Sequence, residues 1–182
     1  LVFSIIRTSS ALYTSKTVGT ADMDVALYAF SYGGMKEDGT SEQTLNFDLG
    51  SIKPGETKTY KFSVSNQDEK TGKVSDTSLR YDLKIITTNN LGLEYKLYKS
   101  NVLLTSSETR VIPDGYSTYF KHMAYPPRCM DYGDTVTIDE YKLEVYYPAN
   151  LYKESKYQDM IESIKLQLVS KQMDSGYNCN GG

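Results

Sequence analysis

The sequence predicts an all-β protein, a two-sheet sandwich of jelly-roll or Greek-key type with an N-terminal extension strand and at most one or two short helices. Three observations carry this prediction. Apolar and polar residues alternate over short runs along most of the chain. Turn-forming residues separate these runs about every 8–12 positions, which gives about ten short strands. The chain has 17 tyrosines and no tryptophan, and tyrosine suits half-exposed strands or a contact surface.

The first elements follow from this pattern in order. Residues 23–32 form a strand candidate that ends at a pair of glycines. Residues 45–49 alternate apolar and polar side chains, and Pro54 and Gly55 follow in the order that favours a type II turn. Residues 59–64 alternate again. The pattern predicts a hairpin of these two strands, with one buried face and one solvated face.

The later elements are predicted in the same way. Further strands are expected at residues 79–85, 93–97, 102–104, 110–112, 118–124, 141–147 and 164–168. Residues 150–160 are the one segment expected to contain a short helix. Beyond Gln172 the composition is typical of a loop.

Composition and charge exclude several classes of protein. Hydrophobic residues make up 39% of the chain and charged residues 24%, which is neither a disordered nor a membrane-spanning composition. The net charge of −3 argues against a nucleic-acid partner, which requires a basic surface.

The chain has two cysteines, Cys129 and Cys179. Two cysteines are too few for a structural zinc site on their own. In an oxidising compartment a disulfide between them is expected, and it would close a loop of about 50 residues. The pairing partner, within the chain or in another copy, stays open at this point.

The first six residues, LVFSII, are apolar on both faces of an extended strand. They are either the end of a secretory signal, with Ser9 and Ala11 at a cleavage-type position, or a retained strand. A strand of this kind is unfavourable in water and belongs between packed layers. Its burial is worth about 8–15 kcal/mol before ordering costs. The large apolar side chains concerned are Leu1, Val2, Phe3, Ile5 and Ile6.

The sequence predicts no catalytic residue, no cofactor and no metal site. His122 is the single histidine, and the paired histidines of a metallopeptidase helix are absent. No nucleophile-elbow or phosphate-binding motif follows a strand. Asp22 with Asp24, and Asp131 with Asp134, are pairs that could help to bind Ca²⁺, but acidic loop residues usually solvate turns.

Three stretches, in this order, resemble the TasA/camelysin family of secreted biofilm-fibre subunits. Residues 11–15 and 19–24 resemble the segment that follows the signal peptide in that family. Residues 49–56 and 60–66 are similar to its L-x-P-G-D turn and F-x-V-x-N strand. Residues 156–172 resemble its closing Y-Q-G and alternating strand. Residues 89–97 also resemble a connector, N-L-P-L-x-Y-x-L, of related surface proteins.

The resemblance implies a jelly-roll subunit that polymerises by donating its N-terminal strand to a neighbour. The expected organisation is a donor segment at residues 1–13, a sandwich at 14–173 and a loop-like tail at 174–182. The expected partners are further copies of the chain, with other matrix or surface proteins, and neither nucleic acid nor a membrane in the mature form. The expected location is outside the cell. An internal core strand is the alternative place for the N-terminal segment.

Two other functions remain open. The first is a monomeric or tip-located adhesin that binds carbohydrate or protein through the tyrosines around the proline-rich loop, Tyr116, Tyr119, Tyr125 and Tyr132. The second is a metalloendopeptidase, an activity assigned to some camelysin relatives. The missing histidines weigh against it.

Overall fold

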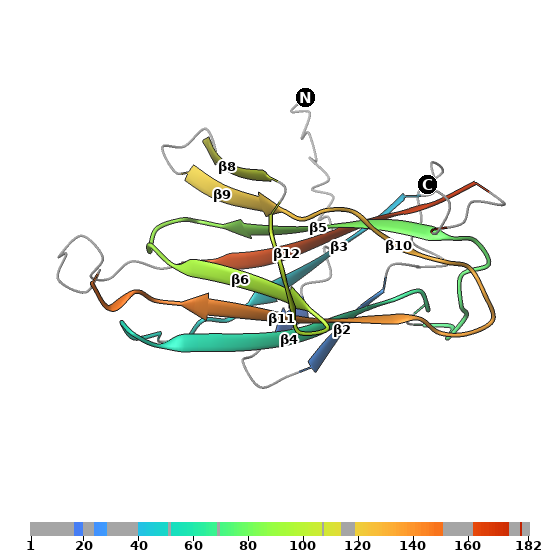
Figure 1. Ribbon diagram of the computed structural model, residues 1–182, viewed down its shortest axis with the longest axis horizontal. Helices are drawn as coiled ribbons and strands as arrows, with labels where there is room; N and C mark the ends of the chain where they lie inside the picture. The colour runs from blue at the N-terminus through green and yellow to red at the C-terminus, as the bar shows by residue number, and fades with distance from the viewer. Residues whose placement is uncertain are drawn as a thin grey trace, which may run out of the picture.

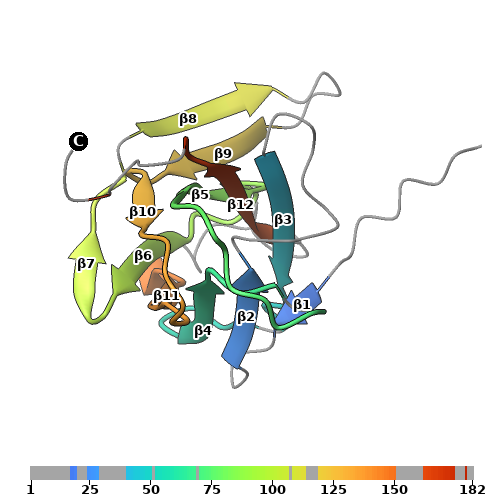
Figure 2. The same cartoon turned by 90° about the vertical axis from the view of Figure 1, so that its right-hand side faces the viewer.

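A computed structural model of the chain describes residues 17–19, 24–28, 40–50, 52–68, 70–106, 108–113, 119–150, 162–174 and 179. These residues form two β-sheets that lie face to face, as Figure 1 shows from the side and Figure 2 from the end. No α-helix occurs within these described ranges. The predicted all-β sandwich of two sheets is confirmed.

The larger sheet has seven strands. Along the sheet they are β1 (Thr17–Gly19), β3 (Thr40–Phe47), β12 (Ile164–Gln172), β5 (Leu79–Thr87), β9 (Tyr119–Ala124) and β8 (Glu108–Pro113), with β10 (Arg128–Met130) paired to β5. Neighbouring strands are antiparallel except β1 and β3, which are parallel.

The second sheet has five strands. In order they are β2 (Asp24–Tyr28), β4 (Thr57–Ser65), β11 (Ile138–Tyr146), β6 (Glu94–Lys99) and β7 (Val102–Leu104). Only β2 pairs with its neighbour in the parallel sense. In each sheet, therefore, the parallel pair contains an N-terminal strand, β1 or β2, and that strand lies at the sheet edge.

The predicted hairpin between residues 45–49 and 59–64 is wrong. β3 pairs with β12 and β1 in one sheet, whereas β4 pairs with β11 and β2 in the other. The linker between them carries Leu49, which is 6% exposed, and Ile52, which packs against the core. Because these side chains face the interior, the linker crosses between the layers and does not reverse at a sheet edge.

The turn within this linker does have the predicted form. The Glu56 N–H donates to the Lys53 carbonyl over 2.9 Å, and Gly55 has a φ of 84°. A type II turn requires this positive φ at its third position, where glycine has no Cβ to clash. The Gly55 N–H also donates to the carbonyl of Tyr147 over 2.7 Å, which fastens the turn to the end of β11.

The core lies between the sheets and follows the predicted alternation. In β5 and β12 every second residue is buried, and the same holds for β11 from Tyr141 onward. The largest fully buried side chains are Tyr60, Tyr81, Leu45, Leu79, Ile85, Leu97, Leu143, Ile164, Leu166, Leu168, Val64 and Val145. Period-two burial of this kind leaves the alternate residues on the outer faces for lysine, glutamate and threonine.

A buried carboxylate holds the connection from β5 to β6. Glu162 is 8% exposed and lies two residues before β12. One of its oxygens accepts from the Asn89 N–H over 2.7 Å and from the Thr88 hydroxyl over 3.1 Å. The other accepts from the Leu91 N–H over 2.7 Å. The Glu162 carboxylate thus accepts hydrogen bonds from backbone N–H groups of a connection that lies outside the strands.

Several expectations fall partly or wholly outside the described residues. The strand predicted at 23–32 is described as β2 over Asp24–Tyr28 only. The segment expected to hold a short helix, 150–160, is described only at Asn150. The described strands run from Thr17 to Gln172, and the structure adds two strands of three residues, β1 and β10, that the sequence pattern does not predict.

Candidate functional site

The sheet edges are the candidate site for assembly, because a strand is added where backbone N–H and C=O groups have no neighbour. The seven-stranded sheet ends at β1 and β8 and has a further short edge strand, β10, which pairs only with β5; the five-stranded sheet ends at β2 and β7. β8 contains Pro113, which has no N–H to donate, and charged residues at 108 and 110. These are features with which proteins protect an edge.

β7 has a different composition. It reads Val-Leu-Leu, and its hairpin with β6 turns through Ser100 and Asn101, whose φ values are 46° and 65°. Two successive positive φ values are those of a type I′ turn, which matches the twist of a hairpin. The Ser100 N–H donates to the Glu140 carbonyl over 3.1 Å, so the turn is held against β11.

The side chains of β7 are largely in solvent. Val102 is 65% exposed and Leu103 is 53% exposed, and they are two of the five large apolar side chains that are exposed among the residues with described burial. β7 pairs only with residues 97–99 of β6, and no described strand lies on its other side. Figure 2 shows it at the outer margin of its sheet.

The predicted donor residues cannot be placed against these edges. Leu1, Val2, Phe3, Ile5 and Ile6 lie outside the described residues. Their assignment to a subunit interface therefore stays a prediction.

A polar cluster lies between the sheets, and sequence analysis missed it. The Tyr81 hydroxyl on β5 donates to Asp139 Oδ2 on β11, and it lies 2.6 Å from the Tyr141 hydroxyl. Lys99 Nζ on β6 lies 2.7 Å from the other oxygen of Asp139. The cluster joins both layers of the sandwich through side chains that alternation places on inner faces.

The tyrosines of this cluster stay protonated at neutral pH. Burial raises the pKa of Tyr81 far above its ordinary value, and the neighbouring Tyr141 and Asp139 raise it further. Burial likewise raises the pKa of Tyr141 to about 12. Because a protonated hydroxyl can donate to a carboxylate, the cluster acts as a hydrogen-bonded tie between the sheets and supplies no ionised nucleophile.

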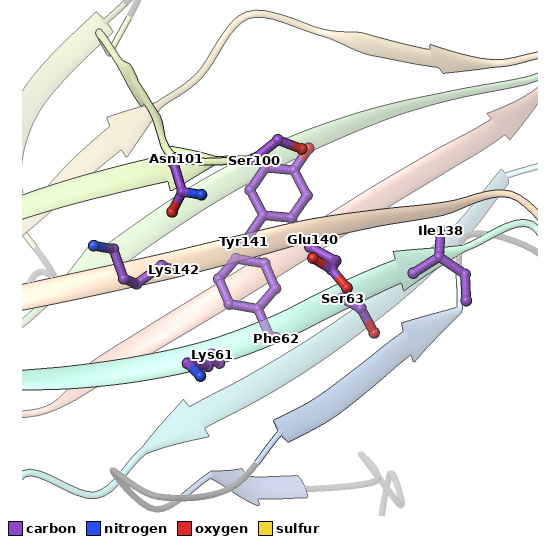
Figure 3. Close-up of a pocket in the computed structure, with 9 residues that line it drawn as sticks. All are labelled: Lys61, Phe62, Ser63, Ser100, Asn101, Ile138, Glu140, Tyr141 and Lys142. Carbon is purple, nitrogen blue, oxygen red and sulfur yellow. The ribbon is translucent and has the colours of Figure 1, made fainter.

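A pocket lies over β4, β11 and the β6–β7 turn (Figure 3). Lys61, Ser63, Glu140 and Lys142 contribute polar groups of both signs to it. Ser63 has no histidine near it to act as a base, because the single histidine of the chain, His122, is on β9 in the other sheet. The ionisable groups that share the lining with Ser63 are Lys61, Glu140 and Lys142.

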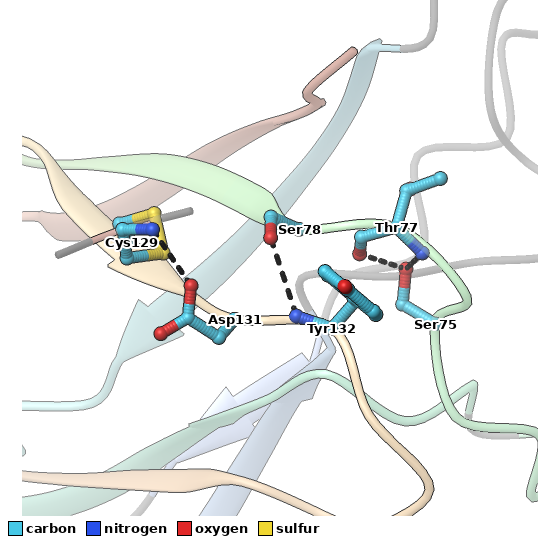
Figure 4. Close-up of a disulfide and its surroundings, with 7 residues drawn as sticks. Ser75, Thr77, Ser78, Cys129, Asp131 and Tyr132 are labelled. Carbon is cyan, nitrogen blue, oxygen red and sulfur yellow. Dashed lines mark hydrogen bonds between the residues drawn. A yellow bond between two sulfur atoms is a disulfide. The ribbon is translucent and has the colours of Figure 1, made fainter. Parts of the chain in front are cut away.

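Cys129 and Cys179 are joined by a disulfide, with their Cα atoms 5.6 Å apart (Figure 4). Cys129 lies in β10, and the Cys179 N–H donates to Asp131 Oδ1 over 2.7 Å. The pairing predicted for an oxidising compartment is therefore present within one chain. A disulfide of this kind is compatible with an extracellular protein.

Among the described residues, His122 has no carboxylate in an ion pair with it and belongs to no metal-ligand cluster. It lies in β9 beside Lys84 and Lys165. Its pKa is lowered by partial burial and then by the positive charge of these two lysines. The positive charge of the two lysines would also disfavour a bound metal cation, so this position fits an ordinary boundary histidine better than a metal site.

Of the two aspartate pairs considered for Ca²⁺, only Asp131 and Asp134 lie wholly among the described residues. Asp22 lies outside the described residues, and Asp131 accepts the hydrogen bond from Cys179. Within the described ranges, no group of three or more histidine, cysteine, aspartate or glutamate side chains is positioned to hold a metal ion.

The predicted tyrosine surface is only partly formed. Tyr132 is 58% exposed, but Tyr125 is 6% exposed and belongs to the core, where burial raises its pKa to about 12. For Tyr125 the prediction of a ligand-contacting residue is wrong, because its ring faces the interior. Tyr116, and the side chain of Tyr119, lie outside what the structure describes.

Neither a protein-family model nor a curated protein matches this chain. The resemblance to the TasA/camelysin family thus stays a prediction from the motifs themselves. Among the described residues no helix has the length and apolar character of a membrane span.

Proposed function

We propose that this protein is a secreted structural subunit of an extracellular filament, in which the N-terminal segment of each copy adds as a strand to a sheet of the next copy. The observation that carries the proposal is which part of the sequence supplies the described core residues. Among residues with described burial, the core is assembled from Leu45 to Leu168, and its members are at most 8% exposed. The described core is therefore formed by strands that follow the N-terminal segment in the sequence.

In the proposed assembly, the five large apolar side chains of residues 1–6 are buried in the next copy. Their transfer from water into another copy would favour association by about 8–15 kcal/mol before ordering costs. Backbone hydrogen bonds to an open edge would add to this, and would cover an edge that otherwise invites aggregation. A contact between the N-terminal segment of one copy and a different surface of the next is head-to-tail, and it produces a filament when it does not close into a ring.

Deletion of residues 1–10 tests the proposal. The full chain and the deletion variant are purified and compared by negative-stain microscopy, sedimentation and far-ultraviolet circular dichroism. We expect filaments from the full chain, and from the deletion variant a soluble monomer with a native β-sheet spectrum. Filaments of normal yield from the deletion variant would remove the proposal.

A matched pair of substitutions separates apolar burial from mere chain length. Phe3→Asp places a charge in the segment, and Phe3→Leu keeps an apolar side chain at the same position. We expect Phe3→Asp to abolish filaments and Phe3→Leu to preserve them, because a buried unpaired carboxylate is strongly unfavourable. Equal assembly of both variants would contradict burial of this segment.

The adhesin is the second candidate, and the exposure of Tyr132 is the observation that favours it. An exposed aromatic ring beside a disulfide-held loop is a reasonable contact for a carbohydrate or a protein. The burial of Tyr125 removes another member of the surface that this function would use. Size-exclusion chromatography at micromolar concentration distinguishes the candidates, since an adhesin domain stays monomeric and a filament subunit does not.

A further inference from the structure

We propose that the outer edge of β7 is the acceptor on which the N-terminal segment of the next copy pairs. This inference rests on the proposed filament function and adds to it the location of the receiving strand. It assigns Val102 and Leu103 as the side chains that the incoming segment covers.

The composition of the five edge strands favours β7. β8 carries a proline and charged residues, β2 begins with Asp24, β10 begins with Arg128, and β1 reads Thr-Val-Gly, with one apolar side chain. By contrast, residues 100–107 read SNVLLTSS and contain neither a charge nor a proline. Soluble proteins usually protect an edge strand with charges, proline, a bulge or a very short strand, and β7, although only three residues long, has neither a charge nor a proline to hinder an added strand.

The register of β7 shows that both of its faces are apolar. Leu103 lies opposite Tyr98 of β6, whereas Val102 and Leu104 lie opposite Lys99 and Leu97. Because successive residues of a strand point to opposite faces, the exposed side chains of Val102 and Leu103 lie on different faces of the sheet. Leu104, on the same face as Val102, is partly buried against the core.

A strand that pairs with this edge must therefore be apolar on two faces. An amphipathic strand would cover Val102 or Leu103 and place polar groups against the other. In the sequence LVFSII, Leu1, Phe3 and Ile5 would point to one face, and Val2 and Ile6 to the other. The chemistry of residues 1–6 thus matches the edge on both sides.

Length selects the same occupant over a second β7. Two copies of β7 paired with each other would share three residues from each side. The six-residue segment spans about 20 Å, which matches an edge that continues from β7 into the uncharged residues 105 and 106. The segment also carries no charge that would oppose Lys99 or Glu94 at the ends of β6.

Site-specific photo-crosslinking tests the assignment in the full chain. Benzoylphenylalanine replaces Leu103, and isotopically light and heavy copies are mixed before assembly so that contacts between copies can be identified by mass spectrometry. We expect crosslinks from position 103 of one copy to residues 1–6 of another. Crosslinks to residues 102–104 of another copy, or crosslinks within one copy only, would overturn the assignment.

Substitutions at the edge give a second, independent readout. Val102→Lys combined with Leu103→Lys introduces the charges with which natural edges are protected, and we expect the filament yield to fall by about tenfold or more. The spectrum and thermal stability of the monomer should be unchanged, because both side chains are already in solvent. Val136→Lys, at an apolar position that is 42% exposed and lies outside the strands, is the matched control and should assemble normally.

The outcomes separate this inference from the filament proposal. If the deletion of residues 1–10 abolishes filaments while the double lysine variant assembles like the wild type, β7 is not the acceptor and the filament proposal stands. If the deletion variant assembles, both are wrong. Loss of assembly in the deletion and double lysine variants, with normal assembly of Val136→Lys, supports both.

Discussion

Removal of the Glu162 carboxylate is expected to destabilise the sandwich several times more than removal of an exposed carboxylate. The side chain holds three donors from residues 88–91, and it does so at 8% exposure. In Glu162→Ala all three donors lose their acceptor. The connection between β5 and β6, which crosses from one sheet to the other, loses the group that fixes its path.

The size of the effect follows from where each donor lies. Asn89 is exposed, so its N–H can bind water and its loss is small. Leu91 is 8% exposed, so its N–H stays without an acceptor. Loss of the hydrogen bond from the buried Leu91 N–H to a charged group costs about 1.5–3 kcal/mol, and loss of the other two donors adds about 1 kcal/mol. The expected decrease in the free energy of unfolding is therefore about 3 kcal/mol. This corresponds to a decrease in Tm of about 6–12 °C for a chain of this size.

Urea unfolding followed by circular dichroism measures this loss, and two further variants control it. Glu162→Gln keeps one acceptor oxygen and should lose about half as much. Glu42→Ala removes an exposed carboxylate that accepts a single hydrogen bond from the Gln167 side chain, and it should cost less than about 0.5 kcal/mol. A loss below about 1 kcal/mol for Glu162→Ala would refute the argument that a buried donor is left unsatisfied.

Three further outcomes are expected. Tyr81→Phe should lower the free energy of unfolding in urea by about 1–3 kcal/mol, because the hydroxyl that donates to Asp139 is removed from the interior. Tyr132→Phe, at an exposed position, should leave the stability unchanged, and equal stabilities of the two variants would contradict this expectation. Reduction of the disulfide should leave the β-sheet spectrum intact and lower stability by about 4 kcal/mol in the loop-entropy model, and an unchanged Tm would show that the closed loop contributes nothing. Stability should fall as the pH rises above about 10, because the unfolded chain then releases tyrosine protons that the native state keeps up to about pH 12. Each such tyrosine contributes up to about 1.4 kcal/mol per pH unit, and ionisation of all 17 tyrosines before unfolding begins would contradict this expectation. The tyrosines concerned include Tyr60, Tyr125 and Tyr141.

The alternation of side chains allowed the sheets to be predicted but not their pairing. In β5, β11 and β12 the period of two is long and regular, and each of these strands is buried on one face as expected. The partner of a strand is set by contacts between residues far apart in the sequence, which a local pattern does not contain. For that reason the strands before and after Pro54 were predicted as a hairpin although they lie in opposite sheets.

The polar cluster between the sheets could not be predicted from the sequence for the same reason. Tyr81, Lys99 and Asp139 come from β5, β6 and β11, and only the arrangement of the strands brings them together. One signal was available, since Asp139 and Tyr141 fall on the same face as the buried residues of β11. Glu162 gave no signal, because a polar residue just before a strand is ordinary. The disulfide, by contrast, was predictable because the chain has only two cysteines.

A cryo-electron microscopy map of assembled material, with the chain traced from its first residue, would show where the N-terminal segment lies. We expect residues 1–6 of one subunit to run alongside a strand of its neighbour, in continuous hydrogen-bonded register. A trace in which these residues return into the interior of their own sandwich would contradict it.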